Sequence, residues 1–376
     1  MQRDAAALKA ALADLEQRNL KRRRRADGGG LVNFCSNDYL GLKAHPDVTR
    51  AFIAAAEKYG VGSGAADLVT GHGPEHEALE DELAAFTGRE KALVFSTGYM
   101  ANLGVIGTLA DQNSLIASDR LNHASLIDGC RLSGAQVRRY RHRDAGHAAE
   151  LLAAATEQTR LLVTDGVFSM DGDVAPLPEL ARSARDSNAW LVVDDAHGLG
   201  VVGATGRGSC EHFGLAASDV PVLVGTFGKA FGTFGAFVAG DADLVEYLLQ
   251  KSRTYVYTTA LPPAVAAATR AALRASQRES WRREKARVLS QRFRRALGEA
   301  HTGSQPVTTI VPVIVGDAAR ALELSAQLEQ QGFLVTAIRP PTVPQGTARL
   351  RVTLSAAHDE AQVDALSSAL TQAVAA

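Results

Sequence analysis

Two apolar segments in the middle of the chain are each followed directly by residues that could do chemistry. Asp194-Asp195-Ala196-His197 follows Leu191–Val193, and Thr226-Phe227-Gly228-Lys229 follows Val222–Val224. Because Lys229 has a small residue on each side, another group can approach its amine closely. Such an amine is a candidate nucleophile toward a carbonyl group. An ionised aspartate at the end of a strand can hold a protonated ring nitrogen.

Three further apolar segments also end at polar or small residues. Ser96-Thr97-Gly98-Tyr99 follows the first of them and precedes a helical stretch, so its backbone N–H groups can face a phosphate. The other two segments are followed by polar groups, namely Asp119, Asn122 and His123 after one and Asp165, Ser169 and Asp171 after the other. Ligands of a parallel sheet bind beyond the carboxyl ends of its strands. We therefore expect these groups to meet at one site.

A lysine, an aspartate and a phosphate-binding turn together indicate a pyridoxal 5'-phosphate (PLP) site. The lysine would form a Schiff base with the cofactor, the aspartate would pair with the pyridinium, and the turn would anchor the phosphate. His123 is expected on the face of the ring and His197 near its phenolic oxygen. A hydrogen-bonded core position remains the alternative for each histidine.

The elements that must position these residues alternate along the chain. Helical patterns begin at Pro46 and Pro74, and helices separate short apolar segments of the kind buried on both faces. This predicts a large α/β domain with a mostly parallel sheet over residues 46–263. A long helix over 264–300, followed by strands and two helices, predicts a smaller α+β domain over 264–376. Residues 1–45 are expected to form an N-terminal helix within 1–20 and an arm.

The composition excludes several other classes of protein. The 376 residues are 46% hydrophobic and 22% charged with a net charge of −1, which is typical of a globular protein without affinity for nucleic acid. No apolar segment is long enough to span a membrane, and no signal peptide is expected. Three widely separated cysteines predict neither disulfides nor a metal site and favour a reducing compartment, the cytoplasm.

Other motifs do not fit their usual context. Gly60-Val61-Gly62-Ser63-Gly64-Ala65 has the spacing of a dinucleotide-binding loop, but it follows a helix instead of a strand. Gly228-Lys229-Ala230 lacks the hydroxyl residue and the upstream glycine of a P-loop. His142 and His147 have no partners at zinc-binding spacing, so no metal is expected.

Seven stretches of the sequence resemble the α-oxoamine synthase family of fold-type I PLP-dependent transferases. The match extends over nearly the whole chain, and the stretch at residues 338–344 resembles the oxononanoate-forming branch of biotin biosynthesis. The stretches are 36–42 (SNDYLGL), 119–125 (DRLNHAS), 166–173 (GVFSMDGD), 193–198 (VDDAHG), 226–229 (TFGK), 338–344 (IRPPTVP) and 346–351 (GTARLR). Relatives usually carry a glutamate in place of Asp165 and a Gly-Ser-rich turn in place of residues 64–68.

The resemblance implies roles for individual residues. Lys229, Asp194 and His123 would be the catalytic groups, as the Schiff-base lysine, the pyridinium partner and the histidine stacked on the ring. Further cofactor contacts would come from Gly98, Tyr99, Ser169, His197, Thr226 and Thr259, although Thr258 is the alternative to Thr259 for contacting the phosphate of a partner subunit. Arg351 would bind the amino-acid carboxylate. The other substrate-binding residues would be Asn37, His123, Thr342 and Arg22, with Lys21 as the alternative to Arg22.

The reaction implied by the resemblance is an acyl transfer. L-Alanine would condense with a pimeloyl thioester, carried by coenzyme A or by acyl carrier protein, to give 8-amino-7-oxononanoate, CO₂ and the free thiol carrier. A homodimer with shared active sites is expected. Two alternatives stay open: a glycine-using relative (2-amino-3-ketobutyrate ligase or 5-aminolevulinate synthase), and a catalytically silent subunit with a PLP fold.

Overall fold

The computed structural model describes residues 4–22, 24, 29–298, 302 and 308–375. Two compact units are present. The larger unit comprises residues 37–287 and 355–357, and the smaller unit comprises residues 1–36, 288–354 and 358–376. Among the helices that the structure describes, none is both long enough and apolar enough to cross a lipid bilayer.

The larger unit is built on a seven-stranded sheet with the order β2-β8-β7-β6-β5-β3-β4. β8 is antiparallel to β2 and β7, and every other neighbouring pair is parallel. β3 and β8 are buried along their whole length, as expected for strands covered on both faces. The predicted, mostly parallel sheet is therefore confirmed. Its strands are β2 (Lys91–Phe95), β3 (Ser114–Asp119), β4 (Gln136–Tyr140), β5 (Thr159–Asp165), β6 (Trp190–Asp194), β7 (Val222–Thr226) and β8 (Ala236–Gly240).

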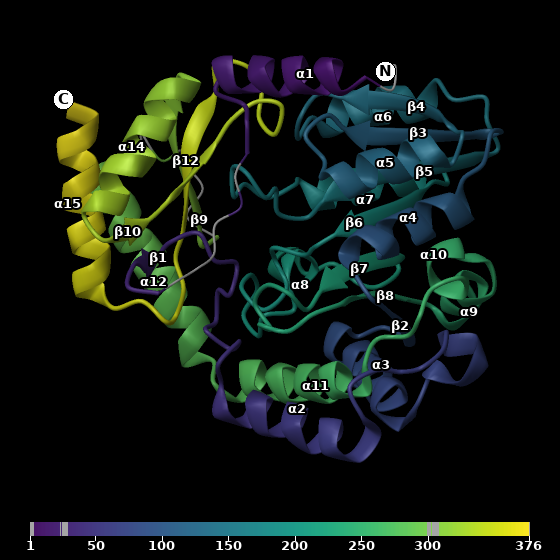
Figure 1. Ribbon diagram of the computed structural model, residues 1–376. Coiled ribbons are helices and arrows are strands. Elements are labelled where there is room, and N and C mark those ends of the chain that lie inside the picture. Colours follow the sequence, from purple (N-terminus) through teal and green to yellow (C-terminus); the bar gives the residue numbers. More distant parts are fainter. Residues whose placement is uncertain (1–3, 23, 25–28, 299–301, 303–307, 376) are drawn as a thin grey trace. The chain divides into compact units, whose positions relative to one another are not determined.

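Helices cover both faces of this sheet (Figure 1). On one face α4, α5 and α9 pack against strand residues such as Ile116 and Val192. On the other face α6, α7 and α8 pack against the alternate residues of the same strands, such as Leu115 and Leu191. These helices are α4 (Gly98–Leu109), α5 (Ala124–Leu132), α6 (Ala145–Ala153), α7 (Leu177–Asp186), α8 (Ser209–Phe213) and α9 (Ala242–Lys251).

Three long helices and two short ones complete the larger unit. α11 packs against α2 and α3, and small residues such as Ala55 and Ala264 allow α2 and α11 to lie close together. The helices are α2 (Pro46–Tyr59), the π-helix η1 (Asp67–Gly71), α3 (Pro74–Thr87), α10 (Arg253–Val256) and α11 (Pro263–Arg278). The predicted segments 1–45, 46–263 and 264–376 stay a prediction. The compact units divide the chain at other positions, and α11 belongs to the larger one.

The long helix predicted over residues 264–300 is wrong as a single element. The structure has two helices there, α11 and α12 (Trp281–Leu297), with a break at Glu279 and Ser280. The side chain of Glu279 interacts with His45 Nε2 at 3.1 Å and accepts a hydrogen bond from Arg282 Nε at 2.8 Å. These contacts tie the break to the start of α2. The N-terminal helix α1 (Ala5–Gln17) lies within its predicted range.

The smaller unit contains a three-stranded antiparallel sheet in the order β11-β12-β9. A short parallel pair, β1-β10, adds a second sheet. The core is formed by apolar side chains from the sheet, the helices and the residue after β1, among them Leu350, Leu324, Leu366, Phe293 and Phe34. The elements are β1 (Val32–Asn33), β9 (Ile310–Gly316), α14 (Ala318–Gln330), β10 (Phe333–Leu334), β11 (Thr336–Ile338), β12 (Ala348–Thr353) and α15 (Glu360–Ala375).

Candidate active site

A cavity of about 260 Å³ lies in the larger unit, at the carboxyl ends of its parallel strands. Eight residues of the predicted site line it: Asn37, Gly98, Tyr99, His123, Asp194, His197, Thr226 and Lys229. They come from the segments that follow β2, β3, β6 and β7 and from the chain before α2. The sheet therefore brings together groups up to 192 positions apart in the sequence.

Asp194 is the last residue of β6 and is only 4% exposed. Asn102 Nδ2 donates to its Oδ2 at 2.6 Å, and the backbone N of Ala196 donates to its Oδ1 at 3.0 Å. These two hydrogen bonds fix the orientation of the buried carboxylate. It is therefore suited to pair with a protonated ring nitrogen.

Asp165 ends the neighbouring strand β5 and is the register partner of Asp194. Burial, and then the nearby charge of Asp194, raise the pKa of Asp165 well above its ordinary value. When two carboxyl groups lie close together in a buried site, one of them holds a proton. The raised pKa therefore favours the protonated form of Asp165 beside Asp194.

His123 is the N-cap of α5, where its Nδ1 accepts a hydrogen bond from Ser125 N at 3.2 Å. Burial is the main reason that the pKa of His123 is lowered; Asp194 opposes this effect and Lys229 adds to it. The ring is therefore neutral near pH 7. A neutral imidazole can lie against an aromatic ring and still donate one N–H.

The turn between β2 and α4 presents the start of a helix to the cavity. Thr97 Oγ1 accepts a hydrogen bond from Met100 N at 3.1 Å, and the helix begins at Gly98. A Cβ atom on Gly98 would lie 2.8 Å from Thr226 Cγ2, so only glycine lets Thr226 approach this turn. Free N–H groups of a helix N-terminus beside a threonine hydroxyl are suited to a phosphate.

His197 and Asn37 are linked through a buried tyrosine. The hydroxyl of Tyr39 lies 2.7 Å from His197 Nδ1 and donates to Asn37 Oδ1 at 3.1 Å. Tyr39 is 0% exposed. This chain of contacts orients the His197 ring at the wall of the cavity.

Two predicted cofactor residues do not line this cavity among the residues that the structure describes. Ser169 lies in the half-buried turn after β5, and Thr259 lies in an exposed segment after α10. The carbonyl oxygen of Thr259 is 3.4 Å from Ser96 Oγ, which donates to it. Their roles stay predictions.

The remaining predicted substrate residues belong to the smaller unit. Arg22 Nη2 donates to Thr342 Oγ1 at 3.1 Å, whereas Lys21 Nζ is bound to Glu16 Oε2 at 2.8 Å within the N-terminal segment. Arg351 lies in β12 and is 7% exposed. The substrate-binding roles of these residues, and the choice between Arg22 and Lys21, stay predictions.

Some residues of the site were not predicted. Ser125 and Phe234 line the cavity beside the expected Asp165, and Asn102 holds Asp194 from helix α4. Asn102 could have been found, because it is a lone amide in the otherwise apolar helix at residues 98–109. Phe234 has no comparable signal in the sequence.

Residues 30–370 match the family model described as aminotransferase class I and II. The chain belongs to the aminotransferase class I and II family. An 8-amino-7-oxononanoate synthase from Methylococcus capsulatus is 59% identical to it over 376 residues, which is 97% of each chain. This agrees with the family resemblance found in the sequence.

Solved structures give the same result for the fold. A serine palmitoyltransferase from S. paucimobilis, in complex with a PLP–myriocin aldimine, has a TM-score of 0.91 and 31% identity, covering 99% of this chain and 98% of that one. An 8-amino-7-oxononanoate synthase from Francisella tularensis has a TM-score of 0.80 and 30% identity, covering 93% and 98%. The fold-type I architecture is therefore confirmed.

The geometry of the cavity fits PLP. An amine (Lys229), a buried carboxylate (Asp194) and the glycine-containing turn at Gly98 lie around one space. The missing side chain at Gly98 is what leaves room for Thr226 beside the turn. The arrangement supplies a partner for the aldehyde, the ring nitrogen and the phosphate of the cofactor.

Proposed function

We propose that this chain condenses L-alanine with a pimeloyl thioester to give 8-amino-7-oxononanoate, CO₂ and the free thiol carrier, a step of biotin biosynthesis. The observation that carries the proposal is that Lys229, Asp194 and His123 line one cavity with the turn at Gly98. The relatives named as synthases of this product, at 56–59% identity, support the choice of substrates.

The cofactor implied by this chemistry is PLP, which supplies an electron sink for the bond broken at the alanine Cα. Lys229 would bind the aldehyde carbon of the cofactor, and Gly98, Tyr99 and Thr226 would hold its phosphate. Asp194 would keep the ring nitrogen protonated because a charged carboxylate stabilises the pyridinium.

Each residue around the cofactor would then have a separate role in the reaction. Released from the aldehyde carbon by the incoming alanine amine, the amine of Lys229 would remove the proton from the alanine Cα and return a proton after CO₂ has left. His123, a neutral side chain in the lining of the cavity, would donate an N–H toward the thioester oxygen as negative charge develops there. Arg351 would bind the alanine carboxylate with its planar guanidinium, and Asn37 would lie near that group.

The acyl donor would be bound by Arg22 and Thr342. Their hydrogen bond at 3.1 Å holds the guanidinium in place, which suits recognition of an acidic acyl group. Coenzyme A and acyl carrier protein are both candidate carriers of the pimeloyl group.

We also infer that the chain acts as a homodimer in the cytoplasm. Val61, Val69 and Tyr257 are 88%, 72% and 73% exposed. The segments that carry them are adjacent, because Ala260 N donates to Ala65 O at 3.0 Å. Exposed apolar side chains gathered in this way favour a protein interface. That interface would bring Thr259 toward the partner subunit's phosphate.

The location in the cytoplasm is inferred from the cysteines. All three are free, which is consistent with a reducing compartment.

The test is product analysis by mass spectrometry of the purified protein with PLP. Alanine is supplied with pimeloyl-CoA or with pimeloyl acyl carrier protein, and glycine is supplied with acetyl-CoA or succinyl-CoA in parallel. Formation of 8-amino-7-oxononanoate with alanine alone supports the proposal. Faster turnover of glycine would instead assign the chain to a glycine-using relative. Lys229→Ala is the control that should abolish turnover.

A further inference from the structure

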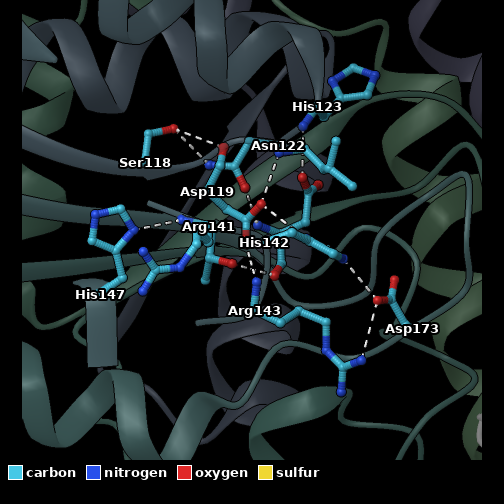
Figure 2. Close-up of polar contacts among 12 residues, drawn as sticks. Ser118, Asp119, Asn122, His123, Arg141, His142, Arg143, His147 and Asp173 are labelled. Carbon is cyan, nitrogen blue, oxygen red and sulfur yellow. Dashed lines mark hydrogen bonds and ion pairs between the residues drawn. The ribbon is translucent and has the colours of Figure 1, made fainter. Parts of the chain in front are cut away.

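His142 lies in the loop between β4 and α6 and is held between two carboxylates (Figure 2). Its Nδ1 is 3.0 Å from Asp119 Oδ1, and its Nε2 is 2.9 Å from Asp173 Oδ2. The side chain of His142 is 16% exposed and that of Asp119 is 1% exposed. An imidazole can donate from both nitrogens only when it is protonated.

The charged groups around His142 favour this protonated form. Burial disfavours the charged ring, but the hydrogen bonds and charges of Asp119 and Asp173 outweigh it and raise the pKa of His142 to about 9. Another charged neighbour is Arg143, whose Nη1 is 3.4 Å from Asp173 Oδ2 and whose backbone N donates to Asp119 Oδ2 at 2.8 Å. The ring of Phe168 packs edge-on against His142 with 4.4 Å between the ring centroids.

The carboxylate of Asp119 belongs to the turn that carries His123. Its Oδ1 also accepts a hydrogen bond from Leu121 N at 2.8 Å, and its backbone carbonyl accepts one from Asn122 N at 3.2 Å. Asn122 Oδ1 accepts from Asp165 N at 3.0 Å, and Asp165 Oδ2 accepts from His123 N at 2.7 Å. A continuous set of hydrogen bonds therefore runs from His142 to the backbone of His123.

The carboxylate of Asp173 belongs to the turn that carries Ser169. The backbone carbonyl of Asp173 accepts a hydrogen bond from Phe168 N at 2.9 Å, and Gly172 N donates to Phe168 O at 2.8 Å. A β-bridge between Val167 and Val174 closes the base of this turn. The position of Ser169 thus depends on a turn whose last residue is bound by His142.

We propose that His142 is a positioning residue, which bridges Asp119 and Asp173 and thereby fixes the turn of His123 relative to the turn of Ser169. The proposal rests on the proposed function for the roles of His123 and Ser169 at the cofactor. His142 itself is not among the described residues that line the cavity. It acts through its two carboxylate partners.

The experiment compares His142→Gln with His147→Gln. Glutamine keeps a polar side chain but cannot span both carboxylates. His147 is the matched control, because it is a nearby histidine in the first turn of α6 whose Nδ1 accepts a hydrogen bond from Arg141 N at 3.0 Å (Figure 2). Hydrogen exchange of the apoprotein is measured over residues 119–123 and 166–175. The holoenzyme is then compared in PLP affinity, in the visible circular dichroism of the bound cofactor, and in kcat and KM for alanine.

We expect His142→Gln to speed hydrogen exchange in both turns, to weaken PLP binding by roughly tenfold, and to change the visible circular dichroism. We expect kcat to fall by about the same factor while KM for alanine changes little. His147→Gln should leave all five quantities within about twofold of the wild type. In the background of Asp173→Asn, the effect of His142→Gln should shrink, because the two residues act as one unit.

A different result would overturn the proposal. If His142→Gln lowers only the melting temperature, and folded molecules keep the wild-type exchange pattern, PLP affinity and dichroism, then His142 has a structural role alone. Exchange and PLP binding do not depend on the identity of the acyl donor. A failure of the proposed condensation would therefore appear as absent product in the wild type, separately from these measurements.

Discussion

Gly98 and Thr226 approach each other so closely that a methyl group on Gly98 would lie 2.8 Å from Thr226 Cγ2. The two residues come from the segments at the ends of β2 and β7. Their contact brings the hydroxyl of Thr226 to the N-terminus of α4. The shape of the turn therefore depends on the absence of a Cβ atom at Gly98.

Gly98→Ala should therefore weaken PLP binding, because the new methyl group pushes Thr226 away from the turn. We expect the dissociation constant of PLP to rise by about tenfold or more, corresponding to a cost of about 1–3 kcal/mol for overpacking. The measurement is titration of the apoprotein with PLP. Thr226→Ser keeps the hydroxyl and removes the conflicting methyl group, so the double variant should recover most of the affinity. A double variant as weak as Gly98→Ala would show that the contact is not the cause.

Asp194→Asn should leave PLP bound but remove the charge opposite the ring nitrogen. We expect exchange of the alanine Cα proton with deuterium from solvent to slow by roughly a hundredfold, because the charged partner stabilises the developing negative charge. The exchange is followed by proton NMR in D₂O. Exchange at the wild-type rate would mean that Asp194 is a structural residue, held by Asn102 for packing alone.

Arg351→Lys tests the assignment of the alanine carboxylate. Lysine keeps the charge but cannot form two parallel hydrogen bonds, so the change is not conservative at such a site. Loss of one charged hydrogen bond, about 1.5–3 kcal/mol, should raise the dissociation constant of alanine roughly ten- to a hundredfold. Alanine binding is followed by the absorbance of the cofactor, and the donor by steady-state kinetics. Should the donor affinity collapse while alanine binding is unchanged, Arg351 binds the other substrate.

Because His142 is bound by the carboxylates of Asp119 and Asp173, the free energy of unfolding is expected to depend on pH. The pKa of His142 is raised from 6.5 to about 9, so its protonated form stabilises the folded chain fully below pH 6.5. This contribution, ~3 kcal/mol at most, is lost as the pH rises from 6.5 toward 9. The difference in melting temperature between wild-type and His142→Gln apoprotein should therefore be large at pH 6 and small at pH 9.5. A difference that stays constant over this range would contradict the raised pKa.

The residues of the site that could be predicted from the sequence are those at the ends of strands. Lys229, Asp194 and His123 each follow an apolar segment, and parallel strands bring such positions to one edge of a sheet. Their convergence therefore needs only the order of elements, not the details of packing. The same argument identified the turn at Gly98.

Other features depend on contacts that no local pattern encodes. Tyr39 reaches His197 across 158 positions of sequence, and nothing in either segment indicates the partner. At the break between α11 and α12, Glu279 contacts His45 and Arg282, although the helical pattern continues through it. Propensity could not reveal the contact of Glu279 with His45, because the two residues are 234 positions apart.

The antiparallel strand β8 also sets the order in which the site can be built during synthesis. Among the described strands, β2 lies at the edge of the sheet beside β8, which pairs Lys91 with Gly240 and Phe95 with Ala236. Contacts between segments so far apart form late, because a long loop must close first. A ribosome must therefore complete β8 before β2 has a strand to pair with. The turn at Gly98 is among the first parts of the site to be translated and among the last to be held in place.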